Sequence, residues 1–166
     1  MSLENAKANL KEFGKDLNLE GLEFDENHTC ILGIDNAFSL HLTYEPNSDR
    51  LYLYGPVLDG LPKDDQSKLR LYEGLLEGSM LGGKMAGGGV GVAVKEELIL
   101  MHSVLEMANA DASSLRRFAP LFVECIETWR KNVKDILEGR TPTGVPGQRD
   151  KKPGDDSGPS DKFIKI

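Results

Sequence analysis

Two short strand-like segments that meet at an acidic turn, within residues 22–34, constrain the fold of this chain most. The segment reads Leu-Glu-Phe-Asp-Glu-Asn-His-Thr-Cys-Ile-Leu-Gly-Ile and is followed by Asp35. Apolar residues that alternate with polar ones are typical of strands with one buried face. No catalytic combination of residue types lies near the segment, so we expect a binding surface here.

Alternating apolar residues predict three antiparallel strands in this part of the chain. The alternation occupies residues 30–34, 38–44 and 51–54. The sequence Pro46-Asn47-Ser48-Asp49 consists of residues that favour turns, so it predicts a hairpin between the second and third strands.

A second hairpin and three helices complete the pattern. Residues 90–94 and 98–104 alternate like strands on either side of a charged turn. Apolar residues recur every three or four positions over residues 3–17, 64–80 and 111–137, which predicts helices with one buried face. The predicted fold class is therefore α+β with an antiparallel sheet, in the order helix, three strands, helix, two strands, helix.

The folded domain is predicted to end near Gly139. Residues 139–166 are rich in Gly and Pro and poor in large apolar residues, so they cannot bury enough surface to offset the entropy lost on ordering. We expect a domain over residues 1–138 and a flexible tail over residues 139–166. For the final Phe163-Ile164-Lys165-Ile166 we expect a disordered end, with a short docking motif as the alternative.

The charge distribution argues against nucleic acid as a partner. The formal net charge is −7. Residues 139–166 contain six Lys or Arg and four Asp or Glu, which leaves a charge near −9 on residues 1–138. Binding to phosphate groups needs a basic surface. An acidic body keeps a protein soluble even where it exposes apolar surface to a partner.

The hydropathy pattern argues against a membrane protein. The sequence has no run of about 18 apolar residues that could span a bilayer. The segment Met1-Ser2-Leu3-Glu4-Asn5 lacks the basic start and apolar core of a signal peptide. We therefore expect a cytoplasmic protein without membrane insertion.

The cysteines and histidines predict neither a metal site nor a disulfide. Cys30 and Cys125 are far apart in sequence and have no second cysteine nearby, so we expect both to be reduced and buried. His28, His41 and His102 fall in separate predicted strands or turns, without the spacing that metal ligands require. No cofactor is expected.

One segment has the spacing of a phosphate-binding loop. Residues 78–84 read Gly-Ser-Met-Leu-Gly-Gly-Lys. However, Met85 stands where the magnesium-binding Ser or Thr should be, and the glycines follow a predicted helix instead of a strand. We expect the glycines to serve a turn or a close strand contact, and we expect no enzymatic activity.

A series of ordered motifs supports a family resemblance. The first two are Leu22-x-Phe24-Asp25-x-x-x-x-Cys30-x-Leu32-x-Ile34-Asp35 and Leu51-x-Leu53-x-Gly55-x-x-x-x-Gly60-x-Pro62. The Leu75-Leu76 helix, a Gly-rich turn, a Val-rich strand and finally the Glu127-Thr128-Trp129-Arg130 helix follow. In this order they resemble the class I type III secretion chaperones, also called the Tir-chaperone or CesT family. The resemblance covers residues 3–137. The first motif is similar to the family's first two strands, and the second to its third strand.

The resemblance implies a bacterial, cytoplasmic homodimer that binds the N-terminal chaperone-binding segment of one or more secreted effectors and keeps it competent for export. It also implies the secretion-system ATPase as a further partner, and a role in virulence. The implied effector-binding residues are Phe13, Leu17, Leu22, Phe24, Leu32, Phe38 and Leu40. The implied dimer-interface residues are Leu71, Leu75, Leu76, Met80, Val90 and Val92.

Three classes of function stay open at this point. The first is an export chaperone for effectors. The second is a regulatory binding protein on the same scaffold, which sequesters a partner to control secretion gene expression. The third is an enzyme that uses the glycine-rich segment near residue 84. Partner identity separates the first two, and a nucleotide titration tests the third.

Overall fold

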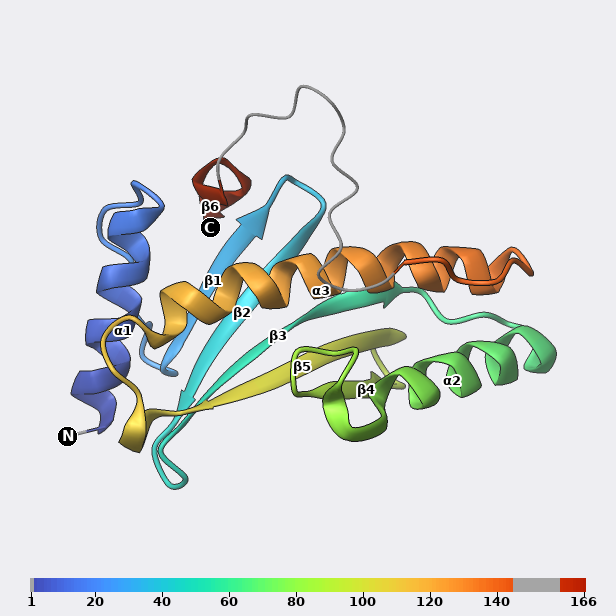
Figure 1. Cartoon of the computed structure of the whole chain (residues 1–166), viewed down its shortest axis with the longest axis horizontal. Coiled ribbons are helices and arrows are strands. Elements are labelled where there is room, and N and C mark those ends of the chain that lie inside the picture. The colour runs from blue at the N-terminus through green and yellow to red at the C-terminus, as the bar shows by residue number, and fades with distance from the viewer. Residues whose placement is uncertain (1, 145–158) are drawn as a thin grey trace. The chain divides into compact units, whose positions relative to one another are not determined.

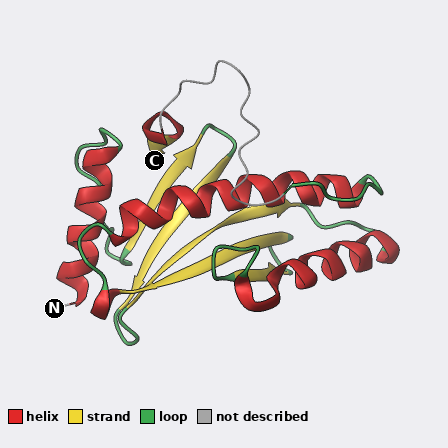
Figure 2. Ribbon diagram, viewed as in Figure 1, coloured by secondary structure: helices red, strands yellow, loops and turns green. Residues whose placement is uncertain are grey.

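The computed structural model describes residues 2–144 and 159–166 (Figure 1). Figure 2 distinguishes the helices from the strands. The helices are α1 (Ser2–Asp16), α2 (Asp65–Ser79) and α3 (Ser114–Leu137), with short 3₁₀ helices η1 (Met80–Gly82), η2 (Met107–Asn109) and η3 (Pro159–Lys162). The strands are β1 (Thr29–Ile34), β2 (Phe38–Glu45), β3 (Arg50–Asp59), β4 (Gly89–Ala93), β5 (Leu98–Glu106) and β6 (Phe163–Lys165). The predicted order of three helices and five strands is confirmed, and β6 is an addition to it.

The strands form a six-stranded sheet in the order β4-β5-β3-β2-β1-β6. β1 is antiparallel to β2, with Leu32 opposite Leu40, and β2 is antiparallel to β3, with Leu42 opposite Leu53. All four of these leucines are fully buried. Alternate residues of a strand point to the same face, so the period of two in the sequence gives one apolar face to the sheet.

The chain divides into two compact units. The first contains Met1–Tyr54, Val104–Pro120 and Arg149–Ile166, and the second contains Gly55–Ser103 and Leu121–Gln148. Consequently β3, β5 and α3 each contribute residues to both units.

Within the described residues, no helix is long and apolar enough to cross a membrane.

In the first unit, α1 packs through an apolar stripe. Ala6, Leu10, Phe13 and Leu17 follow at intervals of three and four residues, and all four are buried. This burial, more than intrinsic helix propensity, stabilises a helix of 15 residues.

Two asparagines fix α1 to the segment that leads into α3. The buried Asn9 accepts a hydrogen bond from the backbone N–H of Leu115 at 3.0 Å through its Oδ1. Asn5 donates through its Nδ2 to the carbonyl oxygens of Met107, at 2.6 Å, and Ala110, at 2.7 Å. The first turn of a helix has unpaired N–H groups, and Asn9 satisfies one of them in α3.

Residues 22–28 do not form the strand that was expected before the acidic turn. The Asp25 carboxylate accepts a hydrogen bond from the Thr29 N–H at 2.9 Å, which holds the chain in a turn. Leu22 is buried against Gly14 of α1, where an added Cβ would lie 3.2 Å from the Leu22 Cδ1. Leu22 therefore packs on α1, and only residues 29–34 pair as a strand.

In the second unit, α2 begins where the sequence predicts. The Asp64 carboxylate accepts a hydrogen bond from the Ser67 N–H at 2.8 Å and so caps the helix. β4 and β5 form the predicted second hairpin, with Val92 opposite Ile99.

Part of the predicted tail is placed in the structure. Phe163–Lys165 form β6, so the disordered end expected for these residues is not what the structure shows. Residues 145–158 lie outside the described residues, so the flexibility of the tail as a whole stays a prediction.

Candidate functional site

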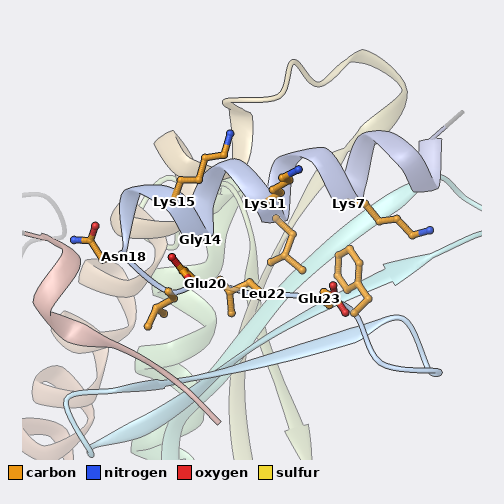
Figure 3. Close-up of a pocket in the computed structure, with 12 residues that line it drawn as sticks. Lys7, Lys11, Gly14, Lys15, Asn18, Glu20, Leu22 and Glu23 are labelled. Atoms are coloured by element: carbon orange, nitrogen blue, oxygen red, sulfur yellow. The ribbon is translucent and has the colours of Figure 1, made fainter.

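A groove of about 820 Å³ lies beside α1 in the first unit (Figure 3). It runs between the helix and the segment that follows it. It is lined by Lys7, Leu10, Lys11, Gly14, Lys15, Asn18, Leu19, Glu20, Gly21, Leu22, Glu23 and Phe24.

Three lysines lie along one edge of the groove. Lys7, Lys11 and Lys15 are four residues apart, so they lie along one side of α1, and all three are exposed (Figure 3). The Lys7 Nζ lies 3.0 Å from the Glu4 carboxylate. A hydrogen bond from Lys15 holds the pKa of Glu12 below its ordinary value. Lys7 and Lys15 are therefore each paired with a glutamate, and Glu20 and Glu23 also line the groove, so the groove carries charges of both signs.

The groove is apolar beneath that edge. Leu10 and Leu22 are buried, while Phe24 is half-buried and lines the groove. An extended peptide could place apolar side chains on Leu22 and Phe24, because a half-buried aromatic ring offers a large contact area at little entropic cost.

The structure separates the predicted effector-binding residues into two groups. Leu22 and Phe24 come together in the groove. The others are buried in the core of the first unit, namely Phe13, Leu17, Leu32, Phe38 and Leu40. Their role in binding an effector stays a prediction. Hydrophobic periodicity identifies the apolar face of a helix or strand, but it does not say whether the protein core or a binding partner covers that face. The sequence therefore could not separate the two groups.

On the side away from β2, β1 pairs with β6. Gly33 lies opposite Ile164 and Ile34 lies opposite Phe163, in antiparallel register. Phe163 is only 5% exposed. The Asp35 N–H donates to the carbonyl oxygen of Lys162 at 2.9 Å, which continues the pairing.

Two sequence signals could have indicated this pairing. Gly33 interrupts an otherwise apolar strand, and such a glycine often marks a close approach by another segment. Here the Ile166 side chain would lie 3.4 Å from a Cβ added at Gly33. The final residues also alternate between Phe163 and Lys165 on one side and Ile164 and Ile166 on the other.

The second unit exposes an apolar surface on α2 and β4. The exposed fractions are 67% for Leu76, 70% for Met80 and 40% for Val92. These three are predicted dimer-interface residues, and a fourth, Val90, is partly exposed. We call this set, Leu76, Met80, Val90 and Val92, the α2–β4 face. The remaining two predicted interface residues, Leu71 and Leu75, are buried inside the unit.

The glycine-rich segment after α2 has a structural role that does not match a phosphate-binding loop. The carbonyl oxygen of Lys84 accepts hydrogen bonds from the Trp129 Nε1 at 2.7 Å and from the Cys125 Sγ at 3.2 Å. Met85, which follows it, is fully buried. The segment leaves the helix α2, whereas a phosphate-binding loop leaves a strand.

The histidines are separated from one another by the fold. His41 stacks on Tyr54 with ring centroids 4.9 Å apart, and burial lowers its pKa. His28 meets Tyr44 edge-on, and His102 lies on β5 opposite Gly89. Over residues 2–144 and 159–166, no group of three or more His, Cys, Asp or Glu could hold a metal ion.

The two cysteines are buried and unpaired. Burial raises the pKa of the Cys30 thiol to about 11. It also raises the pKa of the Cys125 thiol to about 11. Both side chains are therefore neutral at physiological pH, which disfavours a nucleophilic role.

The sequence matches the Tir chaperone protein (CesT) family over residues 8–130. No curated protein matches it.

The fold is similar to several solved structures. A chain of the HopA1–SchA chaperone–effector complex has a TM-score of 0.61 and 28% identity, covering 78% of this chain and 96% of that chain. A chain of the ExsC–ExsE complex has a TM-score of 0.66 and 16% identity, covering 78% of this chain and 94% of that chain. The structure of the Yersinia pestis type III secretion chaperone SycH with a stable fragment of YscM2 gives a TM-score of 0.55 and 20% identity, covering 74% and 98%. At these identities, the last two establish similarity of fold alone.

Proposed function

The chain belongs to the Tir chaperone protein (CesT) family, and we propose that it is a type III secretion chaperone. It binds the N-terminal chaperone-binding segment of one or more secreted effectors and keeps that segment soluble and competent for export. The observation that carries this proposal is the family match together with the similarity to the HopA1–SchA chaperone–effector complex.

The groove beside α1 supports this proposal physically. An extended client segment can place apolar side chains on Leu22 and Phe24, and its own acidic groups beside Lys7 and Lys11. A disordered segment loses entropy when it binds, so a long contact surface serves it better than a small rigid cleft. We therefore propose a binding function and not a catalytic one.

We further propose a homodimer through the α2–β4 face. Leu76 on α2 and Met80, which directly follows α2 in η1, are both more than half exposed, and Val92 is exposed on the neighbouring β4. A contiguous exposed apolar surface is typical of a protein interface. We also propose that the protein works in the bacterial cytoplasm, and that the secretion-system ATPase is a further partner, as the family resemblance implies.

Co-purification tests the main proposal. The effector encoded by the adjacent open reading frame is the first candidate client, and its N-terminal segment is co-expressed with the full chain. We expect the two to elute together. Capture of a regulator of secretion gene expression, with no secreted effector captured, would favour the regulatory function instead.

Substitution of Phe24 then locates the binding surface. Phe24→Asp places a charge in the groove at a half-buried position, so the fold should survive while capture of the effector segment falls at least tenfold. Leu121→Asp is the matched control, because Leu121 is 59% exposed on α3 and does not line the groove. Full capture by a folded Phe24→Asp variant would mean that the client binds elsewhere.

A further inference from the structure

β6 occupies an edge of the sheet on which another extended segment could bind. The sheet has β4 at one edge and β6 at the other. Without β6, the second edge of the sheet would be β1. The β1 side is the one next to the groove, because the Lys165 Nζ donates to the carbonyl oxygen of Gly21 at 2.6 Å, and Gly21 lines the groove. A segment added to β1 would therefore continue toward the groove.

The contact made by β6 relies on one buried side chain. Phe163 packs edge-on against Phe13 of α1, with ring centroids 5.3 Å apart and an interplanar angle of 84°. By contrast, Ile164 is 44% exposed and Ile166 is 71% exposed. A strand of three residues with one buried side chain gains little over the entropy lost on ordering it.

We propose that β6 is a detachable, intramolecular strand that occupies the client-binding edge of β1, and that a client segment binds by displacing it. This inference rests on the proposed function for the identity of the client. The contacts of β6 then define what the edge accepts: a segment antiparallel to β1, with a large apolar residue where Phe163 lies and a basic residue where Lys165 lies. Main-chain pairing supplies affinity at such an edge, and the side-chain positions supply specificity.

A peptide with the chain's own sequence tests the edge without any client. The probe is a fluorescently labelled peptide of residues 159–166, Pro-Ser-Asp-Lys-Phe-Ile-Lys-Ile. We compare its affinity for the wild-type full chain and for the full-chain variant Phe163→Asp, whose β6 can no longer bury its aromatic ring. The variant should bind the peptide at least tenfold more tightly than wild type. Ile164→Asp is the matched control, because Ile164 is exposed, and it should behave like wild type.

Amide hydrogen exchange supplies a second, independent measurement. The Asp35 N–H is bonded to the Lys162 carbonyl oxygen, so it should exchange slowly in wild type and much faster in Phe163→Asp. Adding the peptide to the variant should restore protection. Equal peptide affinity for the two proteins, or unchanged exchange at Asp35, would overturn the proposal. Protection that rises with protein concentration would assign the strand to a second copy of the chain, which also overturns the intramolecular assignment.

The client test separates this inference from the proposed function. An effector segment that co-purifies with the chain should compete with the labelled peptide, and should bind Phe163→Asp more tightly than wild type. An effector segment that binds both proteins equally and leaves the peptide in place uses another surface. That result would overturn the displacement by a client while leaving the chaperone function intact.

Discussion

The indole nitrogen of Trp129 donates a hydrogen bond to the carbonyl oxygen of Lys84 at 2.7 Å. This bond fastens the glycine-rich segment to α3 within the second unit. Trp129 also lies against Gly78 of α2, where an added Cβ would come within 2.2 Å of the indole ring. One side chain therefore joins α2, α3 and the segment after α2, and its packing requires the glycine at position 78.

Gly78 at the end of α2 and Gly83 after it should respond differently to substitution by alanine. Gly78→Ala improves helix propensity by about 1 kcal/mol, but the clash with the rigid Trp129 ring costs about 3 kcal/mol, so we expect a net destabilisation of about 2 kcal/mol. Gly83→Ala has no atom within 4 Å of the added Cβ and a φ of −62°, so its stability should be unchanged or slightly raised. Urea denaturation followed by circular dichroism measures both. Equal stabilities would mean that Trp129 does not pack on α2 as described.

Neighbouring leucines of α2 should separate folding from dimerisation. Leu76→Glu changes a side chain that is 67% exposed, so the fold should persist while the mass measured by light scattering falls from dimer to monomer. Leu75→Glu buries a charge at a position that is 1% exposed and should unfold the protein. Leu121→Glu, at an exposed position on α3, is the control and should stay dimeric. A wild-type protein that is already monomeric at micromolar concentration would remove the proposed dimer.

These two leucines also illustrate what the sequence could predict. The helical period located α2, and the prediction of its start at Asp64 or Asp65 is confirmed. However, α2 carries apolar residues on two faces. Periodicity alone cannot tell the buried Leu71 and Leu75 from the exposed Leu76, because both faces follow the same spacing.

The pairing of the strands could also be predicted only in part. The antiparallel hairpins were predictable, since alternation and turn residues are local signals. The pairing of β6 with β1 joins residues far apart in sequence, such as Ile34 and Phe163. The two local signals for it, Gly33 and the alternation of residues 163–166, do not say which segments pair, and a strand of three residues is a weak signal at the end of a Gly- and Pro-rich tail.

The buried thiols predict a loss of stability at alkaline pH. Burial raises the pKa of Cys30 and of Cys125 to about 11 in the folded state. Because the folded pKa lies above the unfolded value, the stabilisation is fully present at neutral pH and is lost as pH rises from about 9 to about 11. We expect each thiol to contribute up to about 1 kcal/mol to the fall in unfolding free energy between pH 8 and pH 10.

Denaturation in urea at a series of pH values tests this prediction. The double variant Cys30→Ala/Cys125→Ala is the control, because it retains every other group that titrates in this range. Its unfolding free energy should fall less steeply with pH than that of wild type. Parallel curves for the two proteins would show that neither thiol resists ionisation in the folded state.

Deletion of residues 139–166 should leave the fold intact at a modest cost in stability. Burial of Phe163 contributes about 2 to 3 kcal/mol, but fixing each residue of β6 costs about 1 to 2 kcal/mol, partly offset by about 1 kcal/mol for each hydrogen bond. We therefore expect the unfolding free energy to fall by at most about 2 kcal/mol, which corresponds to a thermal midpoint lower by about 4 to 8 °C for a chain of this size. Thermal melts of the deletion variant should remain cooperative. The single substitution Phe163→Ala should account for only part of the change, because the deletion also removes the two hydrogen bonds between Gly144 and the buried Asn132. A broad, non-cooperative melt would show that the tail belongs to the core, because loss of core packing removes cooperativity from a small domain.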